Sequence, residues 1–198
     1  MRRIKIISKI YILTLMATFF SLFSSCNNSK NIDNKYLTAV APKNYANITQ
    51  FENDDILFLD NPMKNGLESI FSIDNTQDLI IQPNIQTIKE FTPKERLISR
   101  LKSIEEETKA PDCNWKNFRI VDQPKEFIFK NYKSAEATFI VDENVNKTGE
   151  IIKKKIRRMV IFTDNDLWNI VLAPSVLENY DKEMQMFNEI LKSIEIKK

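Results

Sequence analysis

Two long strand-like stretches, separated by a short polar segment, constrain most strongly what this chain can fold into. Residues 134–141 (SAEATFIV) and 151–163 (IIKKKIRRMVIFT) are rich in β-branched and aromatic residues, and residues 144–150 (NVNKTGE) have the composition of a turn. The spacing predicts a long antiparallel hairpin. After the turn at 164–166 (DND), the nearly continuous apolar stretch 167–172 (LWNIVL) is typical of a central strand covered on both faces.

Shorter strand candidates occupy much of the remaining chain and are bounded by turn residues. They are residues 36–41, 48–51, 56–59, 67–73, 115–121 and 126–130. The segment 122–124 (DQP) separates the last two, so we expect two strands there rather than one.

Two helices are predicted from their caps and their apolar periodicity. Thr92, Pro93 and Glu95 form a capping box with proline at the first helical position, before apolar residues at 3.6 spacing. A second helix follows Ser175, which has capping-box spacing to Glu178. It carries one narrow apolar stripe that a sheet must receive. The stripe consists of Tyr180, Met184, Phe187, Leu191 and Ile194, widened by Ile190.

The second half of the chain resembles the PsbP-like superfamily, which includes PsbP of photosystem II, a Ran-binding nuclear import factor and bacterial DcrB-type lipoproteins. The resemblance rests on the segment DNDLWNIVL, the APS that follows it, a tyrosine, and a last helix ending in FNEILKSIEI. Residues 36–42, a strand ending in proline, also stand where the family has its first strand. The resemblance implies an α+β fold, an antiparallel β-sheet flanked by helices on both faces, and no shared catalytic residue.

The beginning of the chain has the pattern of an export signal. Four basic residues precede an apolar core, residues 10–23, which is shorter than the about 20 residues of a membrane-spanning helix. Two serines then precede Cys26, an arrangement that resembles the lipobox of bacterial lipoproteins. The resemblance implies a cleaved lipoprotein signal peptide, residues 1–25, and a Cys26 that carries acyl chains such as palmitate and anchors the protein to a membrane. A signal peptide without lipidation and an uncleaved anchor helix are the alternatives.

Residues 26–35 are polar, rich in asparagine and without apolar periodicity, so we expect a flexible tether before a single domain at 36–198. No acidic residue follows Cys26 directly, which favours a position facing the periplasm. Removal of the signal lowers the number of Lys and Arg from 29 to 25 against 27 Asp and Glu, so the formal charge changes from +2 to −2. We therefore expect no nucleic-acid binding.

The composition excludes several kinds of catalytic and metal site. The chain has no histidine, which removes the commonest general base and metal ligand. If Cys26 is acylated, Cys113 is the remaining thiol, and neither an internal disulfide nor a zinc site of His and Cys can form. Cys113 is then a buried small side chain, a reactive thiol or a partner in an intermolecular disulfide. We expect no enzymatic activity, no cofactor and no metal.

Carboxylates are the remaining candidates for chemistry. Residues 54–55, 105–107 and the pair Asp164 and Asp166 could bind a hard cation such as calcium. The DND segment lacks the glycine and the distal glutamate of a calcium loop, so we interpret it as a simple turn.

The densest run of positive charge lies on the second arm of the predicted hairpin. On a strand Lys153, Lys155 and Arg157 share one face, while Lys154 and Arg158 share the other. The run is either a solvated strand that resists aggregation or a docking face for an acidic partner or lipid headgroups.

These features predict a membrane-anchored envelope lipoprotein that acts as a non-enzymatic accessory or interaction module for another envelope protein. A lipoprotein that binds a small ligand or a cation is the second hypothesis. A carboxylate-dependent hydrolase is the third, and it would need two acidic side chains converging in a pocket.

Overall fold

The computed structural model describes residues 29–49, 55–62, 67–74, 91–145, 149–164 and 167–197. The predicted signal peptide and Cys26 lie outside these ranges. So do residues 146–148 and 165–166, which belong to the predicted turns. The chain divides into two compact units, residues 1–43 with 193–198, and residues 44–192.

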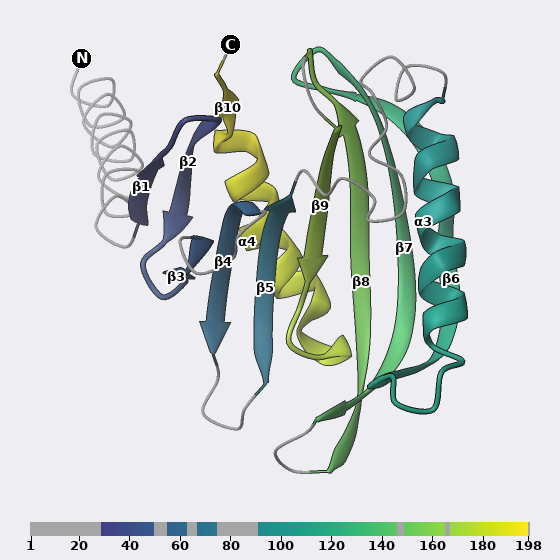
Figure 1. Ribbon diagram of the computed structural model, residues 1–198. Helices are drawn as coiled ribbons and strands as arrows, with labels where there is room; N and C mark the ends of the chain where they lie inside the picture. Colours follow the sequence, from purple (N-terminus) through teal and green to yellow (C-terminus); the bar gives the residue numbers. More distant parts are fainter. Residues whose placement is uncertain are drawn as a thin grey trace, which may run out of the picture. The chain divides into compact units, whose positions relative to one another are not determined.

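Within the described residues, the larger unit builds a seven-stranded sheet in the order β3-β4-β5-β9-β8-β7-β6 (Figure 1). Every neighbouring pair of strands in it is antiparallel. The strands are β3 (Ala46–Asn47), β4 (Asp55–Pro62), β5 (Glu68–Asp74), β6 (Trp115–Phe129), β7 (Tyr132–Val145), β8 (Glu150–Phe162) and β9 (Leu167–Ala173).

The predicted long hairpin is confirmed by β7 and β8. Their register runs from Ser134 opposite Ile161 to Val145 opposite Glu150. Gly149 has a φ of +68° in the connecting turn, a conformation that glycine adopts without steric cost. β8 and β9 lie between β5 and β7, as the apolar stretch 167–172 predicted, and Trp168 is buried there.

The prediction of two strands at 115–121 and 126–130 is wrong, because β6 runs through Pro124 without a break. β6 stands at the end of the strand order, and an edge strand tolerates a residue that has no N–H to donate. Irregular pairing with β7 accommodates the extra residues. The register shifts lie between Lys116 and Arg119, between Ile120 and Asp122, and between Asp122 and Lys125.

At the other end of the sheet, β3 ends at Asn47, before the predicted strand at 48–51, of which residues 50–51 lie outside the described ranges. The Thr49 side chain explains the early end. Its hydroxyl accepts a hydrogen bond from the Phe58 backbone N–H at 2.8 Å, in place of a backbone carbonyl. The same hydroxyl donates to Asn47 Oδ1 at 2.6 Å. A side chain that replaces the ladder in this way ends the regular pairing.

Helix α3 (Pro93–Glu107) begins at the predicted capping box. The Glu95 N–H donates to Thr92 Oγ1 at 3.2 Å, and the Thr92 N–H donates to Glu95 Oε2 at 2.7 Å. The buried residues Leu97, Leu101 and Ile104 belong to the same core cluster as buried residues of the sheet. Those sheet residues are Ala135, Ala137, Phe139, Val141, Ile156, Val160 and Ala173.

Helix α4 (Tyr180–Ser193) buries Met184, Phe187, Ile190 and Leu191 of the predicted stripe, whereas Tyr180 is only partly buried. The Phe187 ring lies 6.0 Å from the Tyr45 ring and 5.9 Å from the Phe71 ring of β5, measured between centroids. Arg157 of β8, which follows Ile156 of the α3 core in the strand, donates a hydrogen bond to Asn188 of α4.

The start of α4 differs from the prediction. A 3-10 turn at Leu177–Asn179 precedes it and has no side-chain cap, so the predicted capping box of Ser175 with Glu178 does not form. Ser175 instead donates two hydrogen bonds to Glu183, from its backbone N–H at 2.8 Å and from its hydroxyl at 2.7 Å. Glu183 is 3% exposed. The sequence spacing therefore predicted the wrong glutamate, Glu178, as the partner of Ser175.

The smaller unit is a sheet of β1 (Ser29–Asp33), β2 (Leu37–Pro42) and β10 (Glu195–Ile196), in the order β1-β2-β10 among its described residues. β2 confirms the strand predicted at 36–41. We expected residues 26–35 to form a tether, whereas the structure pairs residues 29–33 with β2. Ser193 ties the C-terminal segment to this sheet, since its hydroxyl accepts a hydrogen bond from the Val40 N–H at 2.8 Å. None of the described helices is both long and apolar enough to cross a membrane.

Candidate functional site

The basic run on β8 was the main surface candidate, and its three predicted residues differ in their surroundings. Lys153 is exposed and stands opposite Asp142 of β7. Lys155 is partly buried, with its ammonium 4.1 Å from the centroid of the Tyr180 ring in a cation–π contact. Burial raises the pKa of Tyr180, so this phenol is neutral at physiological pH. Lys155 therefore holds the first turn of α4 against β8.

Arg157 is the centre of a larger polar network. Its guanidinium forms an ion pair with Glu136 of β7, in which Nε donates to Oε2 at 2.8 Å, and its Nη1 donates to Asn188 Oδ1 at 3.1 Å. Lys125 of β6 approaches the other oxygen of Glu136 at 3.0 Å. The side chains of Arg157 and Glu136 are only 22% and 13% exposed. The network thus connects three strands with α4.

Lys154, which alternates with these residues, is buried. Its ammonium lies 2.7 Å from Glu143 Oε2 and 3.5 Å from the backbone carbonyl of Glu68. The Lys154 side chain is 7% exposed and that of Glu143 is 25% exposed. An almost buried lysine needs such a partner, because an unpaired charge in the interior is costly. Lys154 therefore contributes to the fold and not to the surface.

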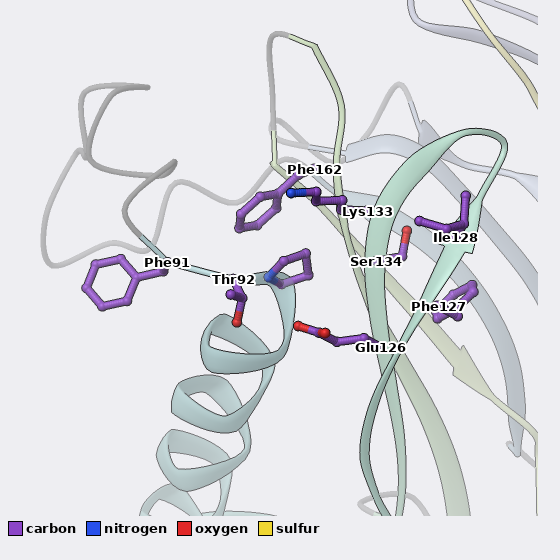
Figure 2. A pocket seen from close by; sticks show the side chains of 9 residues that line it. Phe91, Thr92, Glu126, Phe127, Ile128, Lys133, Ser134 and Phe162 are labelled. Carbon is purple, nitrogen blue, oxygen red and sulfur yellow. The ribbon is translucent and has the colours of Figure 1, made fainter.

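A cavity of about 750 Å³ lies where α3 begins (Figure 2). Its lining comprises Phe91, Thr92, Pro93, Glu126, Phe127, Ile128, Lys133, Ser134 and Phe162. Ile128 of β6 stands opposite Lys133 of β7, and the pairing of Ser134 with Ile161 places Phe162 of β8 next in the same row. The first turn of α3 and Phe91 form the other side.

The cavity is mostly apolar, with two charged side chains. Ile128 is 66% exposed and Phe91 is 45% exposed, and the Arg96 guanidinium covers the Phe91 ring at 4.6 Å from its centroid. Figure 2 shows the Glu126 carboxylate directed toward the first turn of α3 and the Lys133 side chain extending toward Phe162. Glu126 and Lys133 form no ion pair within the described residues.

No pattern in the sequence predicted this cavity. Its residues come from three segments that are far apart in the chain, for which the sequence indicated a helix cap at Thr92 and Pro93 and strands in the other two. No sequence signal marked it, because the exposure of Ile128, two residues from the hairpin turn at Lys130 and Asn131, is known only from the structure. An exposed isoleucine in a strand has no meaning until its neighbours across the sheet are known.

Asp54 and Asp166 lie outside the described residues, and the carboxylate candidates that the structure describes are dispersed. Glu106 and Glu107 pair with Lys109 and Arg100 along α3 at 2.6 and 2.9 Å. Asp164 is exposed and accepts a hydrogen bond from the Tyr132 hydroxyl at 3.4 Å. Among the residues that the structure describes, no group of three or more His, Cys, Asp or Glu side chains could hold a metal ion.

Cys113 is a free thiol of intermediate exposure, between α3 and β6. It is neither fully buried, as a purely structural cysteine would be, nor placed in a strand or helix. The prediction of a buried small side chain is therefore not met, and a reactive thiol or an intermolecular disulfide stays a prediction.

The fold is similar to several solved structures. Cyanobacterial PsbP (CyanoP) from Synechocystis matches with a TM-score of 0.58 and 7% identity, over 86% of this chain and 93% of that one. LpqN from Mycobacterium tuberculosis matches with a TM-score of 0.50 and 11% identity, over 86% of this chain and 91% of that one. A protein from Bacteroides thetaiotaomicron matches with a TM-score of 0.45 and 9% identity, and this chain covers 49% of it.

No protein-family model matches the sequence, and no curated protein matches it. CyanoP and LpqN are nevertheless similar in fold to this chain over 86% of its length. The fold of this chain is therefore PsbP-like, as the resemblance in its sequence implied.

Proposed function

We propose that this chain is a lipid-anchored protein of the bacterial cell envelope that acts as a non-enzymatic accessory or interaction module. The observation that carries the proposal is the PsbP-like fold on a chain that begins with a lipobox-like segment ending at Cys26. LpqN, which has a similar fold, is involved in cell envelope biogenesis. The anchor would place the domain on a membrane, facing the periplasm, after removal of residues 1–25.

The alternation of residues along β8 supports the predicted sandwich. Ile156 and Val160 belong to the core cluster of α3, whereas Lys155 and Arg157 contact Tyr180 and Asn188 of α4. Successive side chains of a strand point to opposite faces. We infer that α3 and α4 cover opposite faces of the seven-stranded sheet.

The absence of histidine from the sequence and the dispersed carboxylates favour binding over catalysis. The predicted interaction surface consists of Lys153, Lys155 and Arg157. Lys155 and Arg157 already hold α4, so we place the contact with an acidic partner at Lys153, which is exposed. A charge at the edge of a contact acts mainly on association rate and specificity.

The anchor is tested by metabolic labelling of cells with radioactive palmitate. We expect label on the natural protein and on Cys113→Ala, and none on Cys26→Ala. The two substitutions remove the same side chain, so the comparison separates acylation at the lipobox from acylation at the other cysteine. Label that survives in Cys26→Ala would refute the anchor.

The interaction is tested by placing a photo-crosslinking amino acid in intact cells at position 153, and at position 102 as a control on the exposed side of α3. We expect one envelope protein to be captured at position 153 and not at position 102. The natural protein or Lys102→Glu, produced in the same cells as a competitor, should weaken capture at position 153, whereas Lys153→Glu should weaken it less. Equal capture at both positions would contradict the surface.

A further inference from the structure

We propose that the cavity at the start of α3 binds an amphipathic carboxylate, with an acyl chain in the cavity and its carboxylate at Lys133. The proposal goes beyond the interaction function, and it does not depend on the lipid anchor. It rests on the size and lining of the cavity, on its exposed apolar side chains, and on the placement of its two charges.

The size and lining are those of a small-molecule site. Pockets that bind small ligands have volumes of roughly 300–1,000 Å³ and are largely apolar with a few polar groups. This cavity measures about 750 Å³ and has Pro93, Ile128 and Phe162 among its apolar residues. An acyl chain is a flexible apolar body that such a lining accepts.

The apolar lining includes side chains that water now contacts. Ile128 is 66% exposed and Phe91 is 45% exposed, at residues from two different segments that meet at the cavity. Large apolar side chains that are exposed together around a hollow indicate a binding site more strongly than single exposed ones do, because exposing a contiguous apolar patch to water is costly. A ligand that covers Ile128 would gain most of the burial energy of that side chain.

The two charges of the cavity differ in what surrounds them. The Glu126 carboxylate points toward the first turn of α3 (Figure 2), where the positive end of the helix dipole offsets a negative charge. Lys133 extends toward Phe162 and has no acidic partner within ion-pair distance among the described residues. The charge left without compensation in the cavity is therefore positive, which selects an anionic head group.

The experiment uses a lysate, membranes included, of cells that produce the full-length protein. A decanoate analogue with a diazirine on its chain is photo-crosslinked to the protein, and mass spectrometry identifies the labelled peptides. We expect label in the peptides that contain Phe91, Ile128 or Phe162. Decanoate, added below the concentration at which it forms micelles, should compete with the label. Label confined to peptides outside the cavity would overturn the proposal.

Head-group selection is tested with competitors that have the same chain. Decyltrimethylammonium carries a positive head group and should compete less well than decanoate for labelling of the natural protein. In Lys133→Met, which keeps an apolar stem, the concentration of decanoate for half-maximal competition should rise about threefold. Lys102→Met removes a charge from an exposed position on α3 and should leave it unchanged. Equal competition by the two compounds in the natural protein would overturn the assignment of an anionic ligand.

The apolar contact is tested with a second matched pair. Ile128 and Ile151 are both exposed strand residues, at 66% and 72%, but only Ile128 lines the cavity. Ile128→Ser should raise the half-maximal concentration of decanoate about fivefold, and Ile151→Ser should not change it. Because both residues are exposed, both variants should fold, which thermal unfolding confirms. An unchanged decanoate concentration for a folded Ile128→Ser would refute the site.

Discussion

Replacing Arg157 tests whether the basic strand serves the fold or the surface. Arg157→Met keeps the length of the side chain but removes its bonds to Glu136 and Asn188. Glu136, whose side chain is 13% exposed, keeps only Lys125 at 3.0 Å, and the Lys125 side chain is 68% exposed. Lys153→Met on the same strand removes an exposed charge and serves as the control.

The magnitude follows from burial. Removing one partner of a fully buried ion pair costs about 3–5 kcal/mol, and a hydrogen bond to a charged group contributes about 1.5–3 kcal/mol. Arg157 and Glu136 are partly exposed, at 22% and 13%, and Glu136 keeps one cation, so solvent screening reduces the loss. We expect Arg157→Met to lower the free energy of unfolding by about 2 kcal/mol, which corresponds to about 4–8 °C in Tm for a domain of this size. Lys153→Met should change it by less than about 0.5 kcal/mol.

The assay is urea unfolding followed by circular dichroism, with Glu136→Gln and the double variant completing a double-mutant cycle. We expect a coupling energy of about 1 kcal/mol between Arg157 and Glu136, because the two side chains share their bonds. A loss below about 0.5 kcal/mol for Arg157→Met, equal to that of Lys153→Met, would show that the network does not hold the sheet to α4.

Two further variants test other parts of the larger unit. Thr92→Ala removes the acceptor of the Glu95 N–H and should lower the free energy of unfolding by about 1 kcal/mol, measured by urea denaturation; no loss would mean that the capping box is not needed to start α3. Burial raises the pKa of Asp60, the Glu68 carboxylate raises it further, and Lys154 opposes both. The stability that Asp60 contributes is therefore full below its unfolded pKa of about 3.9 and is lost as the pH rises through its folded pKa. Asp60→Asn should gain stability over the natural protein between pH 4 and pH 7, and a constant difference across that range would contradict this.

Periodicity and capping predicted the elements whose local sequence agrees with their environment. The arms of the β7–β8 hairpin, the start of α3 at Thr92 and the buried stripe of α4 all belong to this group. In each, the apolar pattern or the cap is complete within the segment itself, so tertiary contacts only reinforce it.

The failures share a different origin, because they depend on contacts between distant segments. Pro124 interrupts a strand in the sequence, but its position at the end of the sheet makes it tolerable. Glu183 rather than Glu178 binds Ser175, because the chain makes a 3-10 turn before α4 begins. The polar residues 29–33 form a strand through backbone pairing with β2, which composition does not reveal. The cavity belongs to this class as well, since Phe91, Ile128 and Phe162 meet only in the folded sheet.

The interrupted edge of β6 has a consequence for how copies of this protein behave when they are crowded together. A strand at the end of a sheet is a template on which another chain can polymerise. Proline at position 124 and three shifts of register in the pairing with β7 make this edge strand irregular. A second molecule therefore finds no continuous row of hydrogen-bonding groups to pair with. The irregularities that made β6 difficult to predict from the sequence also protect the protein from cross-β stacking.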